Sequence, residues 1–416
     1  MTAHTEAGPS GIPTALTGRR GADAAAYEAD PLGYLARAAQ RHGDLFHFAA
    51  AQLYVGSPEL VHTVLTRTGR QVHAGHDPLN GFRKVSEEHT ARWLEGRRAG
   101  TPGLGASPEG ERRMTEQLRA DLAGLTGVVD VPAVAAGICS RSALAHCFAG
   151  AVPPEVQRGV ARSAETFTEV MDAPVPLPAW LPGTAARRAR AAARDLAAAL
   201  DGYLAAQGGC PARAADPDLP ATLAAYGFTD PVQARATLQV ILAGTHVVPG
   251  AALCWLVAEL AARPEVAERI RAAADDTYAT AVAQEVLRLY PPVWLGAREV
   301  AAPFELGGHT LTAGQSLAFS PYLLQRDPRW WRKPEAFRPE RWLDAAEGGP
   351  TTRHAYLPFG SGARICPGYR LGLRQLTLAA RLLAGLHTLT VERADLTPTF
   401  ESVLTPTELL VRFTPR

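Results

Sequence analysis

One segment near the C-terminus constrains the fold of this chain more than any other. Residues 358–368 have the sequence PFGSGARICPG, and a stretch with helical periodicity, Tyr369 to Leu386, follows directly. Gly360 and Gly362 let the backbone approach a flat ligand closely. Because Cys366 precedes the helix, free N–H groups at the helix N-terminus would point at its sulfur and stabilise a thiolate. The segment therefore predicts a loop that presents one activated cysteine.

Two neighbours of this cysteine support the same interpretation. Arg364 can pair with a carboxylate of a ligand, and Pro367 suits a first helical position, where a missing N–H costs little. The alternative is a glycine-rich loop with an incidental buried cysteine. Phe, two Gly, Arg, Cys and Gly nevertheless fall in one frame, FGSGARICPG. This frame resembles the heme-binding signature of cytochromes P-450, FxxGxRxCxG, at every fixed position.

The resemblance covers nearly the whole chain and implies a cofactor and its ligand. It implies heme b (iron protoporphyrin IX) with the Cys366 thiolate as the axial ligand to the metal. Thiolate ligation pushes electron density onto heme iron and favours O–O cleavage. Arg298 matches the position of a family heme-propionate partner, and a solvated arginine is the alternative. The cofactor-binding residues expected with Cys366 are Pro358, Phe359, Gly360, Arg364, Gly368, Arg298, Ala243 and Gly244.

Two further motifs strengthen the resemblance. Glu285 and Arg288 share one face of a predicted helix and can form an ion pair. The segment Phe337 to Trp342 resembles the family's next signature element, whose arginine joins the Glu–Arg pair in a buried triad. The resemblance thus implies a structural triad of Glu285, Arg288 and Arg341, with a surface salt bridge as the alternative for the first two.

Composition excludes several other classes of protein. The chain has 416 residues, 47% hydrophobic and 20% charged, with 42 basic and 41 acidic residues, so it can bury a large core. The charge balance gives no support to nucleic-acid or membrane-surface binding. Val247 to Ala258 is too short for a transmembrane helix, and Met1 to Arg20 lacks a signal-peptide segment. The expectation is a cytoplasmic protein that binds no membrane.

The cysteines outside the loop suggest no metal cluster. Five cysteines are scattered without a CxxC pair, which argues against zinc and iron–sulfur sites. Cys139, Cys147 and Cys254 lie in apolar helical runs and are expected to be small core residues, and Cys210 is expected in a loop.

The periodicity of the chain predicts a mainly α fold with a small β region, and the resemblance implies the cytochrome P-450 fold. We expect a flexible N-terminus over residues 1–20 and one heme-binding domain over 21–416. Residues 71–105 are expected to form a long irregular loop that borders a ligand site. The expected helices are Asp30 to His42 as the first, Pro58 to Thr66, Pro108 to Gly124, Val131 to Phe148, Pro153 to Val170, Ala185 to Gln207 and Pro231 to Ala262. Strand signals occur at Leu45 to Val55, Phe304 to Leu306, Ser316 to Phe319 and Leu409 to Phe413.

The chain departs from the family on the predicted distal helix. Ala243 and Gly244 fit the family pattern, but His246 stands at the acid position and Val247 at the threonine position. The usual acid and hydroxyl position water and deliver protons to the reacting dioxygen. His246 and Val247 are therefore the candidate catalytic positions. Pro249 cannot donate to the carbonyl of Thr245, so the helix is expected to kink.

A second departure concerns the helix Pro108 to Gly124. The family often has His or Trp there with Arg four residues later, both contacting heme propionates, and this chain has Arg113 and Gln117. Arg112 or Arg113 could substitute, but a solvated helix face is favoured for both. Arg112, Arg113, Arg370 and Arg374 could also form a basic docking face around Cys366, with a solvated face as an equal alternative.

These features predict a heme-thiolate monooxygenase that oxidises a hydrophobic small molecule of specialised metabolism, with a terpenoid as one guess. Its expected electron donors are a ferredoxin and a ferredoxin reductase. The alternative is an atypical heme-thiolate enzyme that is peroxide-dependent, ring-forming or redox-neutral, because His246 and Val247 replace the usual acid and alcohol. A third possibility is a heme protein that only carries or senses a ligand.

Overall fold

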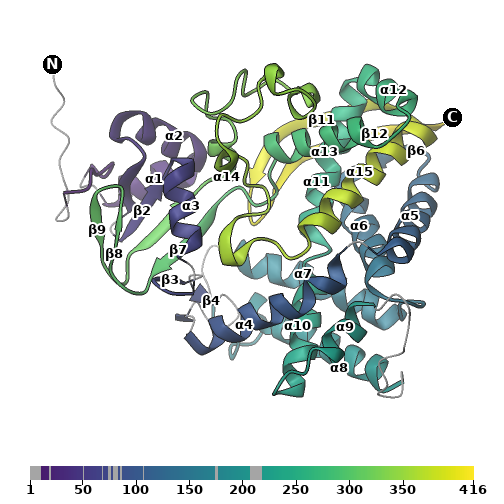
Figure 1. Ribbon diagram of the computed structural model, residues 1–416, viewed down its shortest axis with the longest axis horizontal. Coiled ribbons are helices and arrows are strands. Elements are labelled where there is room, and N and C mark those ends of the chain that lie inside the picture. Colours follow the sequence, from purple (N-terminus) through teal and green to yellow (C-terminus); the bar gives the residue numbers. More distant parts are fainter. Residues whose placement is uncertain are drawn as a thin grey trace.

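The computed structural model describes residues 11–17, 20–49, 51–67, 69–73, 76–77, 83–84, 87–105, 107–173, 177–206 and 218–416. Helices predominate. Most of the strands gather with the N-terminal helices at one side of the molecule, whereas the C-terminal hairpin lies among the longer helices at the other (Figure 1). The predicted mainly α fold with a small β region is confirmed.

The N-terminal side is built around a five-stranded sheet with the order β1-β2-β10-β7-β3. Most residues of its strands β1, β2 and β10 are buried, and the fully buried Leu53 and Leu317 lie in register on the parallel pair β2 and β10. The elements of this side are α1 (Arg20–Ala29), α2 (Pro31–His42), β1 (Leu45–Ala49), β2 (Gln52–Val55), α3 (Pro58–Thr66), β3 (Val72–His73), β7 (Gly296–Val300), β8 (Phe304–Leu306), β9 (His309–Leu311) and β10 (Ser316–Phe319).

The helical side holds the main hydrophobic core. Helix α11 is nearly all apolar and is buried from Gly250 to Ala261, which places it at the centre of this core. The elements here are α4 (Glu87–Gly100), α5 (Pro108–Ala123), β6 (Gly127–Asp130), α6 (Val131–Cys147), α7 (Pro154–Met171), α8 (Ala185–Ala206), α9 (Leu219–Ala225), α10 (Pro231–Ala243), α11 (Val247–Ala262), α12 (Pro264–Ala272), α13 (Thr277–Leu289) and α15 (Tyr369–Leu386). The two-stranded pair β4 (His76–Asp77) and β5 (Arg83–Lys84) completes this part.

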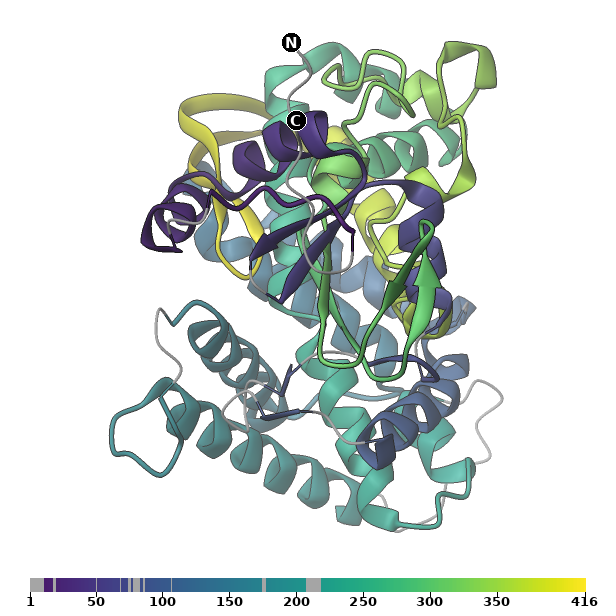
Figure 2. The same ribbon diagram turned by 90° about the vertical axis from the view of Figure 1, so that its left-hand side faces the viewer.

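The remainder of the chain links the two sides. Strand β11 (His387–Phe400) pairs with β12 (Leu404–Pro415) as a long hairpin, and β12 also pairs with β6. Figure 2 shows this hairpin in yellow beside the purple N-terminal helices. Leu32 of α2, Trp294 and Leu404 form a small cluster there, so the hairpin holds the two sides together. The remaining elements are α14 (Pro321–Leu324) and the short 3-10 turns η2 (Pro102–Leu104), η3 (Pro339–Trp342), η4 (Ala345–Glu347), η5 (Arg353–Ala355) and η6 (Gly362–Arg364).

Three expectations need correction here. Residues 71–105 are not one irregular loop, because α4 occupies Glu87–Gly100. Helix α2, capped by Asp30 as expected, is preceded by α1. The long helix predicted over 231–262 is divided into α10 and α11 by a break at residues 244–246.

The start of the chain is packed where the structure describes it. Ile12 is fully buried in the core beside the sheet, and the backbone of residues 13–15 pairs with His47 of β1. Part of the segment expected to be flexible therefore belongs to the fold, and residues 1–10 lie outside the described residues. Cys210 lies outside them as well.

One helical stretch is long and apolar enough to cross a membrane by length and composition. It runs from Val232 to Ala262 across the break, and 61% of its most apolar window is buried inside the protein. The apolar run was expected to be too short for a transmembrane helix, and the length of this helical stretch does not bear that out. Its burial is that of a core helix in a globular protein.

Candidate cofactor site

A cavity of about 690 Å³ opens between the two sides of the molecule. Its walls come from α4, from α10 and the start of α11, from β7 and β10, and from the glycine-rich loop with the first turns of α15. Cys366 lines this cavity together with five other predicted loop and strand residues: Pro358, Phe359, Gly360, Arg364 and Arg298. Gly244 and Gly368 line it too, whereas Ala243 is not among the lining residues.

A backbone hydrogen bond between the two ends of the glycine-rich loop fixes its conformation. The Cys366 N–H donates to the carbonyl of Phe359 at 2.8 Å, which closes the loop on itself. Gly360 and Gly362 both have positive φ, 70° and 68°, a region that disfavours other residues. A Cβ at Gly362 would collide with the Leu65 carbonyl of α3. The predicted close approach to a flat ligand therefore fits Gly360. Gly362 instead allows the loop to pack closely against α3, because it has no side chain.

The surroundings of Cys366 have opposing effects on the pKa of its thiol. Burial raises the pKa of the Cys366 thiol, while the Gly368 N–H and the positive charge of Arg97 lower this pKa. Gly368 is the N-cap of α15, so the expected donation from the helix start is present. A thiolate here needs further positive charge, which a bound metal ion supplies.

Three arginines face the cavity without a carboxylate partner among the described residues: Arg97, Arg298 and Arg364. Burial lowers the pKa of both Arg298 and Arg364 to about 10. The Nε atoms of both side chains are buried and lack a hydrogen-bond partner. Buried cations without partners are costly, so this cluster is built to receive an anion. The carboxylates of heme fit these residues.

Helix α4 supplies residues that the sequence analysis did not identify. Trp93 and Arg97 stand four residues apart on it, and both line the cavity. The Arg364 guanidinium lies 4.0 Å from the centre of the Trp93 ring, and that of Arg97 lies 4.9 Å from it. The indole thus holds two cations in place.

The expected aromatic–arginine pair was consequently assigned to the wrong helix. Arg113 of α5 donates from Nε to the Ala145 carbonyl at 2.9 Å, at the end of α6, and neither Arg113 nor Gln117 lines the cavity. Arg112 is solvated, as expected, whereas the Arg113 side chain is only 18% exposed. Trp93 and Arg97 have the expected four-residue spacing in the sequence. They were not identified because residues 71–105 were expected to form a loop and not a helix.

The break between α10 and α11 changes which residues face the cavity. Gly244, Thr245, Val248 and Pro249 line it, and His246 and Val247 do not. The Thr245 N–H and hydroxyl both donate to the Leu242 carbonyl, at 3.0 and 2.7 Å. The kink predicted at Pro249 is present as this break.

His246 faces the opposite side of the helix. Its Nε2 lies 3.5 Å from the Glu165 carboxylate of α7, and its side chain is only 7% exposed. Burial lowers the pKa of His246, and the nearby Glu165 opposes this. His246 and Val247 therefore lie outside the cavity lining, and their role as the catalytic positions stays a prediction.

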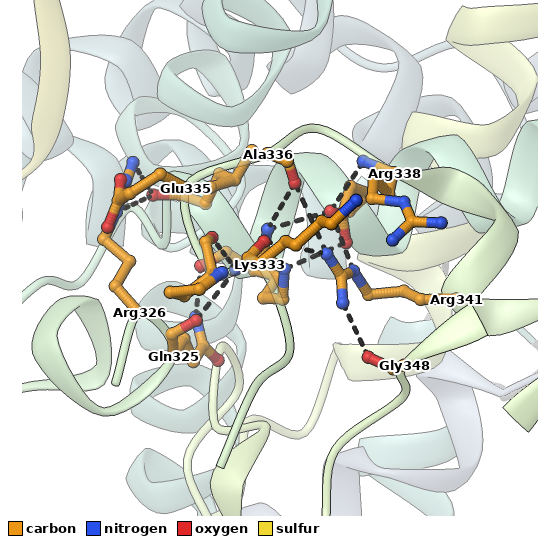
Figure 3. Close-up of polar contacts among 12 residues, drawn as sticks. Gln325, Arg326, Lys333, Glu335, Ala336, Arg338, Arg341 and Gly348 are labelled. Atoms are coloured by element: carbon orange, nitrogen blue, oxygen red, sulfur yellow. Dashed lines mark hydrogen bonds and ion pairs between the residues drawn. The ribbon is translucent and has the colours of Figure 1, made fainter. Parts of the chain in front are cut away.

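The predicted triad is buried rather than a surface contact. The Arg288 guanidinium donates to both Glu285 oxygens at 2.9 and 2.8 Å, and Arg341 Nε donates to Glu285 at 3.0 Å. All three side chains are sealed from solvent. Figure 3 shows Arg341 also reaching the carbonyl of Gly348. The triad ties α13 to the segment that leads into the glycine-rich loop.

Comparisons with known proteins agree with this geometry. Residues 165–411 match the family model for cytochrome P450. Cyclooctatin synthase of Streptomyces melanosporofaciens is 43% identical over 108 residues, 26% of this chain and 23% of that protein. Cyclooctat-9-en-7-ol 5-monooxygenase of the same organism is 36% identical over 160 residues, 35% of this chain and 34% of that protein. The matches thus span about a quarter to a third of these relatives.

Solved structures extend the likeness to most of the chain. Retinoic acid-bound cyanobacterial CYP120A1 has a TM-score of 0.74 and 20% identity, covering 93% of this chain and 95% of that chain. A zebra fish cytochrome P450 with progesterone has a TM-score of 0.76 and 20% identity, covering 93% and 99%. At this identity the likeness concerns the fold. The family match extends over more than half of the chain and includes both the triad and the cysteine loop, so the chain belongs to the cytochrome P450 family, which implies a heme with a cysteine thiolate ligand.

Proposed function

We propose that this protein is a heme b monooxygenase, one domain over residues 21–416, with Cys366 as the axial ligand. One observation carries the proposal: Cys366 and three carboxylate-free arginines of the described chain face the same cavity. When bound there, heme would supply the iron at which dioxygen is reduced and a substrate C–H bond is oxidised. Arg97, Arg298 and Arg364 would hold its carboxylates, and the Cys366 sulfur would hold its iron.

The remaining cavity residues bind and shield the substrate. The wall formed by α10 and α11 exposes aliphatic side chains such as Val240, Ile241 and Val248, which exclude water from the reacting position. The Thr245 proton is committed to the Leu242 carbonyl, so this hydroxyl can accept a hydrogen bond from water or substrate. The substrate is a hydrophobic small molecule, and the relatives named for cyclooctatin and cyclooctat-9-en-7-ol support a terpenoid of specialised metabolism.

The proposed electron donors are a ferredoxin and its reductase, in the cytoplasm. The expected docking arginines contribute unequally. Arg112 is paired with Glu109 and Glu116, and Arg374 is paired with Glu111 and Asp276, while Arg370 contacts only Tyr369 among the described side chains. These carboxylates weaken the basic face, so the rate of reduction should fall only modestly with added salt.

One observation favours an atypical enzyme as the second candidate. Asp230 is the one carboxylate among the cavity-lining residues that the structure describes, and it caps the start of α10. The wall therefore lacks an acid beside Thr245 and Val248. Product formed with hydrogen peroxide alone, at a rate matching the ferredoxin-supported reaction, would support this candidate over the monooxygenase.

The proposed ligand is tested by the spectrum of the reduced, carbon-monoxide-bound protein. We expect the red-shifted band of a thiolate-ligated heme and its loss in Cys366→Ala. Cys139→Ala is a matched control, because Cys139 also lines the cavity but lies buried in α6. Cys147→Ala and Cys254→Ala should keep the band too. A band that survives the loss of Cys366 would refute the proposed site.

A further inference from the structure

Helix α10 presents one hydroxyl to the cavity that has no hydrogen-bond partner among the described residues, that of Thr237. Other helical threonines donate back to their own helix, such as Thr115 to the Glu111 carbonyl at 2.7 Å and Thr166 to the Arg162 carbonyl at 2.7 Å. Thr237 does not. A free hydroxyl in an apolar wall is a group that gains from a ligand.

The neighbouring helix leaves room for this hydroxyl. A Cβ at Gly96 of α4 would collide with the Thr237 Oγ1, so the hydroxyl lies over the bare backbone of Gly96. Both residues line the cavity. The crossing of α4 and α10 thus forms a small notch with a hydroxyl in it.

The other polar groups on this wall are already partnered. Gln233 donates to the Arg92 carbonyl and to Glu95, at 3.1 and 2.8 Å. Asp230 accepts from the Val232 N–H at 3.0 Å. Arg92 pairs with Glu88 at 2.8 Å, and Arg97 is assigned to the heme carboxylates, so this wall offers no free cation to a substrate. An anionic ligand would therefore be buried without a counter-ion.

The part of the wall that α10 and α11 form is hydrocarbon without aromatic rings. Val240 and Val248 are 59% and 38% exposed, although both line the cavity, so they present uncovered aliphatic surface. The aromatic lining residues Trp93, Phe319 and Phe359 come from α4, β10 and the cysteine loop. This wall offers no ring for aromatic stacking.

We infer that the substrate is an aliphatic, non-anionic compound with one hydroxyl group, which the notch of Thr237 and Gly96 binds. The inference rests on the proposed function and specifies the substrate of the same site. Thr237 would set the orientation of the molecule by one hydrogen bond while the valines bind its hydrocarbon body. A single hydrogen bond to a neutral group changes affinity by roughly 2- to 10-fold.

The test uses the heme-loaded protein and the spectral shift on ligand binding. Cyclododecanol and cyclododecane are titrated as a matched pair, with 1-naphthol as the aromatic comparison. We expect cyclododecanol to bind roughly 2- to 10-fold more tightly than cyclododecane, and 1-naphthol to bind less tightly than cyclododecanol. Thr237→Val should reduce the alcohol-to-hydrocarbon ratio to about one and leave cyclododecane binding unchanged, because valine keeps the shape and removes the hydroxyl.

Two further variants sharpen the result. Gly96→Ala should cover the Thr237 hydroxyl and lower the same ratio, whereas Thr115→Val should keep it, because the Thr115 hydroxyl donates to the Glu111 carbonyl and lies outside the cavity lining. An alcohol preference that persists in Thr237→Val, or one absent from the native protein, overturns the inference. A protein that binds no heme, or lacks the red-shifted carbon-monoxide band, refutes the proposed function instead.

Discussion

Val248 lines the cavity beside Thr245, whereas Val247 does not. Val248→Thr should therefore put a hydroxyl where it can hydrogen-bond water at the reacting position, and raise product formed per NAD(P)H consumed severalfold. Val247→Thr makes the same chemical change on a side chain outside the cavity lining, so the ratio should stay unchanged. Equal effects of the two substitutions would contradict the observed register.

Individual residues could be predicted from the sequence where a fixed spacing determines their place. The loop from Pro358 to Gly368 is such a case, because it is short and its glycines restrict the backbone. The sequence pattern did not reveal that His246 and Val247 lie outside the cavity lining, because successive residues of a helix point about 100° apart. A break such as that at residues 244–246 rotates every later side chain, and a pattern of residue types does not record this rotation.

Helix α3 and the turn η5 meet the cysteine loop through a pair of histidines. The rings of His62 and His354 stack with centres 3.8 Å apart, and Ser361 Oγ lies 3.4 Å from His62 Nδ1. Burial, together with the charges of His354 and Arg353, lowers the pKa of His62. His62 is thus neutral in the fold at a pH where it would be protonated in the unfolded chain. Its stabilising effect is complete above the unfolded pKa and is lost as the pH falls below it.

Acid should consequently loosen this contact. We expect the midpoint of thermal unfolding to fall between about pH 7 and about pH 5, and the fall to be smaller in His62→Phe, which keeps an aromatic ring against His354. His309→Gln, in the β8–β9 hairpin, serves as the control and should follow the native curve. An identical pH dependence in His62→Phe and the native protein would show that the stacked pair has no such role.

Helix α4 was not predicted from the sequence. Its sequence is EEHTARWLEGRRAG, with few apolar residues and two glycines that lower helix propensity by about 1 kcal/mol each relative to alanine. The structure explains these glycines by packing, since a Cβ at Gly96 or Gly100 would collide with Thr237 or Ile241 of α10. Tertiary contacts therefore override the local signal, and only the neighbouring helix reveals why α4 forms.

At the scale of the whole molecule, the prediction from sequence was most complete for the buried network around Glu285. Glu285, Arg288 and Arg341 come from two distant segments, and each lies in a recognisable motif. The network continues to the cysteine loop: Arg288 donates to the Gln325 carbonyl at 2.9 Å, and the Gln325 side chain accepts from the Leu357 N–H at 2.6 Å. The sequence did not indicate Gln325, because a lone glutamine between helices has no pattern to identify it.

Glu285→Ala should therefore destabilise the whole protein. The change leaves two sealed arginines, Arg288 and Arg341, without their shared carboxylate, and breaking a buried pair in this way costs about 3–5 kcal/mol. We expect a lower denaturant midpoint and less bound heme, because the same network fixes the base of the cysteine loop. Glu268→Ala removes a surface carboxylate that pairs with the partly exposed Arg271 and Arg416 and should cost less than about 1 kcal/mol. Heme content and chemical unfolding measured on both variants decide the matter: equal, small losses would mean that Glu285 contributes no more than a surface carboxylate.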